Sequence, residues 1–381
     1  MERQYLRECI EALCKAYSAL LHLNCDKAIS KSSYGKGDSL YLDAAPEVTI
    51  IKTLCENFDP HLPLVIEEIG SSAELRGTEE EVVCFSDPMD RSKILAEFLS
   101  KHTGKVGPIF QELKTTKEWE SNYGGNIELS GPYGSITAVR HHYILFNVMI
   151  NYVTGMLYIA SDVGVGKLNV SEIFEDHEKT LLKRTKHLLD MLSPISFEQD
   201  GILQEDEKKF VTFCAGKTER DKKKYEDNLI ASKIFGNELI DQIRENYLIY
   251  DEPGGPARIL YLQYPHSAGF ILSNGEKICE WLGWLAYVKY CWPKLRAYEI
   301  SFDSSWTRNQ ILMAPGRAYS ILGNHIVKER GLPYKKIQLN ISKLKFLDNP
   351  SQYRSTILIC PEANSKVVME LSIEKYVELR F

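Results

Sequence analysis

The chain has 381 residues, of which 44% are hydrophobic and 26% are charged. These values are typical of a globular protein that is large enough for two hydrophobic cores, and they exclude a disordered or fibrous chain. The formal net charge of −6 at pH 7 gives no general attraction to nucleic acid or to an anionic membrane. A small-molecule partner is therefore favoured.

Nine cysteines are scattered along the chain without a Cys-x-x-Cys pair, which predicts reduced, mostly buried thiols rather than a disulfide framework or a zinc site. The segment from Met1 to Arg7 is charged, and no apolar run approaches about 18 residues. The basic run Lys222-Lys223-Lys224 lies between acidic residues and is interpreted as a solvated helix face. We expect a cytoplasmic protein with neither a membrane nor a nucleic-acid partner.

In the N-terminal half, apolar residues at helical spacing predict helices over Glu2–Leu23 and Pro46–Phe58, separated by a loop over Lys31–Asp43. Short β-like runs follow at Pro63–Ile69 and Val82–Ser86. Three further β-rich runs are separated by turn residues and predict an antiparallel meander: Ser135–Arg140, Tyr143–Val153 and Met156–Ser161.

After a charged block over Ser171–Lys209, strands and helices alternate, which favours a largely parallel sheet. The expected strands are Phe210–Cys214, Tyr247–Tyr250, Ser267–Leu272, Asn309–Ala314, Thr356–Cys360 and Val367–Ser372, and the expected helices are Glu219–Asn246 and Glu280–Cys291. We predict an α+β domain over residues 1–205, an α/β domain over residues 206–327 and an unassigned extension over residues 328–381.

The segment Asp87-Pro88-Met89-Asp90-Arg91-Ser92 carries the clearest chemical signal. Asp87 ends a β-like run, and Pro88 stiffens the turn that follows. A helix is predicted over Lys93–Leu99, so the amides of Arg91 and Ser92 lie near a helix N-terminus, where an anion can bind.

Glu67-Glu68 ends the preceding β-like run and can bring further carboxylates to the same place. Carboxylate oxygens are the hard ligands that Mg²⁺ prefers. The alternative is that Asp87 only caps the helix while Asp90 and Glu67 are solvated surface charges.

The hexapeptide, and the separation of Glu67 from Asp87, resemble the signature of the inositol monophosphatase and fructose-1,6-bisphosphatase superfamily, the lithium-sensitive, Mg²⁺-dependent phosphatases. That signature is Asp-Pro-(Ile/Leu)-Asp-Gly-(Thr/Ser), with a Glu-Glu pair about twenty residues earlier. The resemblance extends from Glu2 to Val327. It implies an α/β protein with a layered α-β-α-β-α sandwich, an antiparallel N-terminal sheet and a mostly parallel C-terminal sheet.

The resemblance also implies a set of metal ligands. These are Glu67, Asp87, the carbonyl of Met89, Asp90 and Glu280. They would hold two or three Mg²⁺ ions, for which Mn²⁺ is an expected substitute and Li⁺ an expected inhibitor. Glu280 precedes Ala286-Tyr287 much as the last acidic ligand does in the bisphosphatase branch. The alternative is that Glu280 only favours a helix N-terminus electrostatically, and Asp303 and Glu299 are reserve candidates.

For catalysis, the resemblance implies that Ser92, with Glu68 or Asp43, orients and deprotonates the attacking water. Arg91 and Ser92 would bind the substrate phosphate. The substrate pocket would be lined by Gly254, Gly255 and Ala257.

Two residues depart from the family pattern: Arg91 replaces the signature glycine, and Glu252-Pro253 stands where the family often has an arginine. We expect a Mg²⁺-dependent phosphomonoesterase acting on a small sugar phosphate or inositol phosphate. The alternative is a catalytically silent protein of the same fold that binds a phosphorylated ligand or another protein. The expected partner is a small phosphorylated metabolite, and the oligomeric state is left open between a homodimer and a homotetramer.

Overall fold

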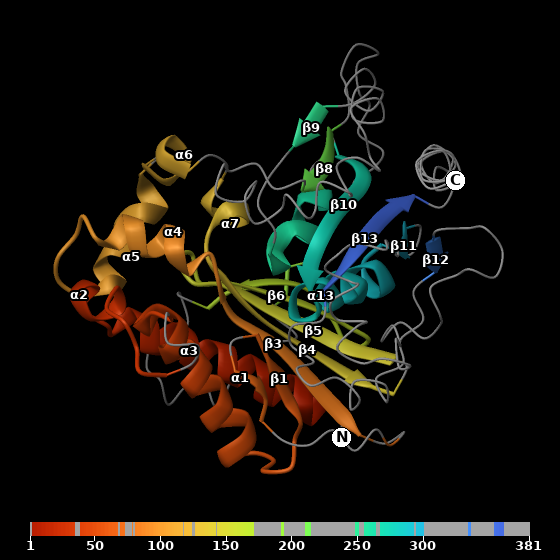
Figure 1. Cartoon of the computed structure of the whole chain (residues 1–381), viewed down its shortest axis with the longest axis horizontal. Helices are drawn as coiled ribbons and strands as arrows, with labels where there is room; N and C mark the ends of the chain where they lie inside the picture. The colour runs from red at the N-terminus through yellow and green to blue at the C-terminus, as the bar shows by residue number, and fades with distance from the viewer. Residues whose placement is uncertain are drawn as a thin grey trace, which may run out of the picture.

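The computed structural model describes residues 2–34, 39–67, 69–72, 78, 81–116, 118–123, 126–141, 143–170, 192–193, 210–214, 248–250, 255–263, 267–292, 295–300, 334–336 and 354–361. Within these residues the chain forms two sheets and the helices that pack against them (Figure 1). The predicted helix over Glu219–Asn246 and the predicted strands Asn309–Ala314 and Val367–Ser372 lie outside the described residues.

The first sheet has seven strands in the order β2-β1-β3-β4-β5-β6-β7. Strands β1 and β3 are parallel, and the other described pairs are antiparallel. The predicted meander is therefore confirmed in β4, β5 and β6. The bounds are β1 Leu64–Ile66, β2 Gly70–Ser71, β3 Val82–Asp90, β4 Tyr133–Arg140, β5 Tyr143–Asn151, β6 Met156–Ser161 and β7 Val165–Asn169.

Helices α1 (Glu2–Leu21) and α3 (Tyr41–Ile51) cover one face of this sheet (Figure 1). The apolar stripe of α1 is buried in a cluster with β3, β4 and β5, as its helical spacing predicts. Helix α3 begins before the predicted start at Pro46 and continues into a π-helical turn, Lys52–Glu56. The remaining helices of this half are α2 Cys25–Ala28, α4 Ser92–Leu99, α5 Val106–Thr115, α6 Glu118–Tyr123 and α7 Ile127–Ser130.

Helix α13 (Ile278–Tyr290) and the 3₁₀-helix η3 (Pro256–Gln263) pack on the opposite face, between the two sheets (Figure 1). Every residue of α13 from Ile278 to Tyr287 is buried. A helix that is buried all round belongs to a core. Trp281 and Trp284 lie in a second apolar cluster that contains residues from both sheets.

The second sheet has the order β12-β11-β13-β10-β8-β9. Its bounds are β8 Phe210–Cys214, β9 Leu248–Tyr250, β10 Ser267–Lys277, β11 Leu295–Ile300, β12 Tyr334–Lys336 and β13 Arg354–Pro361. Its described pairings are mixed: β10–β8 and β8–β9 are parallel, whereas β10–β13, β11–β13 and β11–β12 are antiparallel. The expected mostly parallel sheet is not seen, because β13, from the predicted extension, inserts between β10 and β11.

In Figure 1, helices α1 and α3, the first sheet, helix α13 and the second sheet thus follow one another in this order. A fifth, outer helical layer would fall outside the described residues, and the domain boundaries at 205 and 327 stay predictions. None of the described helices has the length and apolar character that a membrane span requires. Seven cysteines with described side chains are free thiols, five of them buried, in agreement with the predicted reduced state.

Candidate metal centre

Three carboxylates from separate elements meet beside the parallel pair β1 and β3. Glu67 directly follows β1, Asp87 lies in β3, and Glu280 lies in the first turn of α13. Each offers one oxygen such that the three oxygens lie within 4.8 Å of one another. All three residues are buried, with 8%, 1% and 8% of their surface exposed.

Strand register explains part of this meeting. Ile66 pairs with Ser86, and the amide of Glu67 donates to the carbonyl of Ser86 at 3.1 Å. Glu67 is therefore carried past the end of β1 alongside Asp87. Among the described residues, Glu67, Asp87 and Glu280 form the group of acidic, histidine or cysteine side chains that lie close enough together to hold a metal ion. The sequence predicts all three as metal ligands.

Lys277, the residue that precedes α13, binds two of these carboxylates. Its ammonium forms an ion pair with Oε1 of Glu67, and its backbone amide donates to Oε2 of Glu280 at 3.1 Å. The side chains of Lys277 and Glu67 are only 16% and 11% exposed. Buried carboxylates in a low dielectric require compensating positive charge, and Lys277 supplies part of it.

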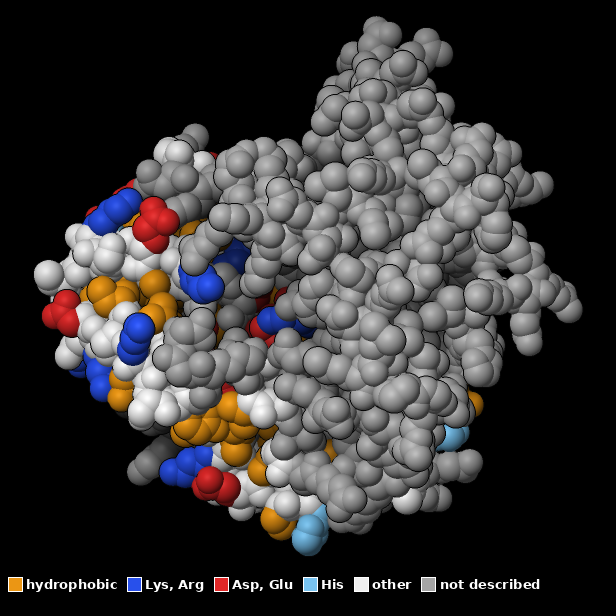
Figure 2. Space-filling view, in the orientation of Figure 1, with side chains coloured by type: hydrophobic (Ala, Val, Ile, Leu, Met, Phe, Trp, Pro, Cys, Tyr) orange, Lys and Arg blue, Asp and Glu red, His pale blue; other side chains and the backbone are white. Residues whose placement is uncertain are grey.

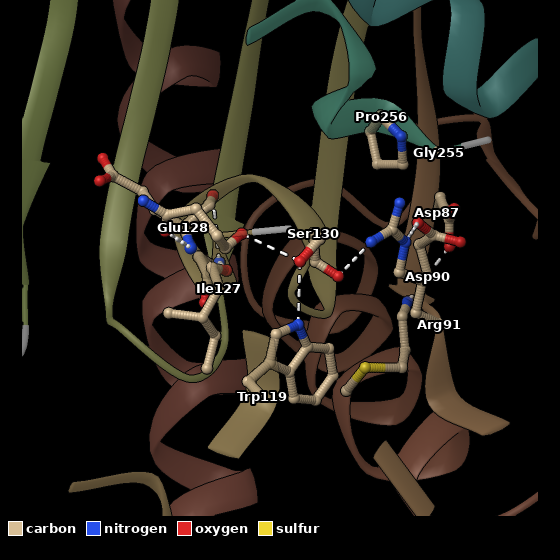
Figure 3. Close-up of polar contacts among 12 residues, drawn as sticks. Asp87, Asp90, Arg91, Trp119, Ile127, Glu128, Ser130, Gly255 and Pro256 are labelled. Atoms are coloured by element: carbon tan, nitrogen blue, oxygen red, sulfur yellow. Dashed lines mark hydrogen bonds and ion pairs between the residues drawn. The ribbon is translucent and has the colours of Figure 1, made fainter. Parts of the chain in front are cut away.

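Asp90 is separated from the group of three by a β-bulge. Pro88 has no N–H to donate to the ladder, and the β3–β4 register shifts between Asp87 and Asp90. The sequence predicts a turn after Asp87, but the strand continues to Asp90 through this irregularity. Oδ2 of Asp90 lies 3.7 Å from Nε of Arg91 and against the backbone of Gly255 (Figure 3).

Arg91 has the left-handed backbone conformation, with φ 63° and ψ 26°. Glycine adopts this conformation readily, which explains why the signature motif has glycine at this place. The side chain is 9% exposed, and its Nη1 donates to the carbonyl of Ser130 at the end of α7 (Figure 3). Trp119 fixes the same residue by donating from Nε1 to Oγ of Ser130 at 2.9 Å.

No protein-family model and no curated protein matches this sequence. The structure is similar to that of the extragenic suppressor protein SuhB from Bartonella henselae, with a TM-score of 0.50 and 11% identity over 97% of this chain and 98% of that chain. The chain has the fold of this SuhB protein, which is an inositol-monophosphatase-like fold. This similarity agrees with the family resemblance that the motif around Glu67 and Asp87 predicts.

Two further solved structures have lower scores. Inositol monophosphatase from Anabaena (Nostoc) sp. PCC 7120 is 10% identical, with a TM-score of 0.49 over 99% of this chain and 96% of that chain. CysQ from Bacteroides thetaiotaomicron, described as a bacterial member of the inositol monophosphatase family, is 13% identical, with a TM-score of 0.48 over 93% and 96%.

Two hydrogen bonds fix the segment that follows Asp87 in this fold. The hydroxyl of Tyr152 donates to the carbonyl of Pro88 at 2.8 Å, and the amide of Met89 donates to Oδ1 of Asp87 at 3.2 Å. Burial, and then the negative charge of Asp87, raise the pKa of Tyr152 well above its ordinary value, so this hydroxyl stays a donor. A Cβ at Gly134 would clash with the tyrosine hydroxyl, and glycine therefore permits the contact.

Gly255 brings the second half of the chain to Asp90. It has φ 139°, and a Cβ there would collide with the Asp90 carboxylate. Nε1 of Trp284 in α13 donates to the carbonyls of Gly255 and Pro256, both at 3.2 Å. The predicted pocket glycine is thus fixed beside a predicted metal ligand.

The other predicted residues lie in α3, α4 and η3 or outside the described part of the chain. Asp43 is in the first turn of α3, where its Oδ2 accepts from the amide of Leu40 at 2.9 Å. Ser92 is the first residue of α4, and Ala257 is buried in η3. The placements of Glu68, Gly254 and Asp303, and that of the Glu299 side chain, are not among those described.

Lys277 is the main residue that the sequence reasoning missed. The available signal was its position three residues before Glu280, at the start of a predicted helix, where its amide meets that carboxylate. The pairing of its ammonium with Glu67 joins residues 210 positions apart, which local spacing does not reveal. Figure 2 shows acidic and basic side chains together in a hollow near the middle of the displayed face.

Proposed function

We propose that this protein is a divalent-metal-dependent phosphomonoesterase that hydrolyses a small sugar phosphate or inositol phosphate, with Mg²⁺ as the natural cofactor. The observation that carries the proposal is the buried trio Glu67, Asp87 and Glu280, placed between sheet and helix in an inositol monophosphatase fold. The SuhB likeness supports the fold, and the carboxylates support the chemistry.

The donor set fits a hard divalent cation. All three side chains offer carboxylate oxygens, which suit Mg²⁺ or Mn²⁺ better than softer metals. Glu67, Asp87 and Glu280 would hold the metal, joined by Asp90 and the carbonyl of Met89.

When bound, the metal supplies Lewis acidity toward a phosphate oxygen and lowers the pKa of a water molecule. The chain supplies the remaining steps. The backbone amides of Arg91 and Ser92, at the start of α4, would donate hydrogen bonds to phosphate oxygens. Ser92, with Asp43 or Glu68, would orient the attacking water and accept its proton.

The placement of Arg91 bears on how substrate phosphate is held. Its guanidinium is bound by the Ser130 carbonyl and lies beside Asp90. We assign its phosphate contact to the backbone amide, because the side chain already has these acceptors. The left-handed backbone of Arg91 turns the chain from β3 into α4 as the signature glycine would.

The test is phosphate release from a mixed panel of sugar and inositol phosphates, with Mg²⁺ titrated in the presence and absence of Li⁺. Asp90→Asn should abolish release without unfolding the protein, because it removes a ligand charge while keeping the shape. Asp162→Asn, at an exposed position, is the matched control and should retain activity. Hydrolysis that survives Asp90→Asn would show that the mechanism is wrong.

A second candidate function is that of a catalytically silent protein, which binds a phosphorylated ligand or another protein and hydrolyses neither. The Lys277–Glu67 ion pair favours it, because the chain partly neutralises its own carboxylates. Binding of Mg²⁺ or Mn²⁺ with silence across the whole substrate panel would select this candidate.

We further propose a cytoplasmic location, and a homodimer or a homotetramer. Light scattering of the purified full chain would distinguish the two assemblies from a monomer.

A further inference from the structure

We propose that Lys277 is a tethered competitor of the divalent metal, with its ammonium at the place on Glu67 that a metal ion would otherwise take. The inference rests on the proposed function, since it concerns the same carboxylate site. It adds a control on metal affinity that is built into the chain itself.

The first argument is geometric. The ammonium of Lys277 contacts Oε1 of Glu67, and Glu67 is one of the three residues whose oxygens lie within 4.8 Å of one another. A cation that used all three carboxylates would have to share Glu67 with this ammonium. Two positive charges at one buried oxygen repel each other, so metal binding requires the lysine to move.

The second argument concerns where the lysine is anchored. Its backbone amide donates to Oε2 of Glu280, which holds the Lys277 main chain at the edge of the site even when its side chain leaves. Lysine has a flexible stem of four carbons, so its ammonium can withdraw from Glu67 while the start of α13 stays in place. The side chain is 16% exposed, which gives it a route toward solvent.

The third argument compares how the buried carboxylates are stabilised in the metal-free and in the metal-bound protein. Without metal, the ammonium compensates a carboxylate that would otherwise be buried beside two others. With metal, the divalent charge replaces this compensation. Removal of the lysine charge should therefore lower the stability of the metal-free protein and raise its affinity for the metal. One substitution thus has two effects of opposite sign.

The experiment measures Mn²⁺ affinity of the purified full chain by calorimetry, with thermal unfolding in chelator and in Mn²⁺. Lys277→Gln should lower the Mn²⁺ Kd by about tenfold or more and reduce the melting temperature in chelator. Lys277→Arg keeps the charge and should retain a Kd close to that of the unaltered protein. Lys167→Gln removes the lysine that pairs with Glu128 at 3.2 Å, away from the trio, and should leave the Kd unchanged.

An unchanged or higher Kd in Lys277→Gln would overturn the inference but leave metal-dependent hydrolysis standing. An equally lowered Kd in Lys277→Arg would also overturn it, because charge would not be the cause. If Lys277→Gln binds Mn²⁺ and the natural chain does not, the competitor role is supported and the metal-dependent function of the natural chain is refuted. If neither protein binds Mn²⁺, both proposals fail.

A measurement on the unaltered chain covers the case in which Lys277→Gln does not fold. Amine acylation at Lys277, quantified by mass spectrometry, should increase several-fold when Mn²⁺ is added, because the displaced ammonium becomes accessible. Acylation at Lys167 should stay constant. Labelling of Lys277 that is unchanged by saturating Mn²⁺ would contradict the displacement.

Discussion

At the scale of single residues, the site depends on main-chain positions as much as on carboxylates. Arg91 turns the chain with a left-handed backbone, and Gly255 leaves room for the Asp90 carboxylate. The family resemblance predicted Glu67, Asp87 and Glu280 as metal ligands, and the structure places their carboxylates together. It missed Lys277, because which side chain reaches Glu67 depends on how α13 packs against β1.

Gly255→Ala should displace Asp90, because the added Cβ collides with its carboxylate and φ 139° is unfavourable for alanine. We expect phosphate release to fall by about tenfold or more, a barrier increase of about 1.4 kcal/mol. Gly104→Ala is the matched control, since Gly104 has φ 90° and nothing within 4 Å of the added Cβ. It should lose about 1 kcal/mol of stability and keep its activity. Equal activity of the two variants would contradict the role given to Gly255.

Tyr152→Phe should loosen the segment between Asp87 and Asp90, because the Pro88 carbonyl loses its buried donor. The free energy of unfolding should fall by about 1–3 kcal/mol, and the Mn²⁺ affinity should fall with it. Tyr290→Phe removes another hydroxyl that donates to backbone carbonyls, those of Ile144 and Leu145. It should destabilise the protein without weakening Mn²⁺ binding, so a Tyr152→Phe variant with unaltered affinity would refute the positioning role.

At the scale of elements, α13 connects the two halves of the structure. Its first turn provides Glu280, Trp284 fixes Gly255, and Tyr290 at its end bonds to β5. The helix was predictable from its apolar sequence, and the meander from its alternating runs. The position of β13 between β10 and β11 was not, because strand pairing across the chain depends on the whole sheet rather than on local pattern.

The contact at the end of α13 predicts a dependence on alkaline pH. Burial, and then the negative charges of Asp162 and Glu2, raise the pKa of Tyr290 to about 12, above its usual value near 10. The folded state therefore holds this proton more tightly than the unfolded state. Its contribution to stability is complete below about pH 10 and is lost as the pH rises toward 12.

Denaturant titrations of the natural chain and Tyr290→Phe should therefore differ by about 1 kcal/mol at pH 8. The difference should shrink as the pH rises from about 10 to about 12. A difference that stays constant over this range would show that the hydroxyl proton is not held by the fold.

At the scale of the whole molecule, the trio joins both halves of the chain, because Asp87 lies in the first sheet, Glu67 directly follows its strand β1, and Glu280 comes from α13. Metal binding should therefore stabilise the fold as a unit. At a free Mg²⁺ concentration of 100 times Kd, the gain is about 2.7 kcal/mol for one site. Thermal unfolding with and without chelator should show this gain in the natural chain and lose it in Asp87→Asn; a similar gain in both would place the metal elsewhere.

The most direct test of the metal centre is an anomalous difference map from a crystal grown with Mn²⁺. We predict a peak within coordination distance of carboxylate oxygens of Glu67, Asp87 and Glu280, with the Lys277 ammonium moved away from Glu67. A map with no peak among these three carboxylates, at a Mn²⁺ concentration that saturates the protein in solution, would contradict the account.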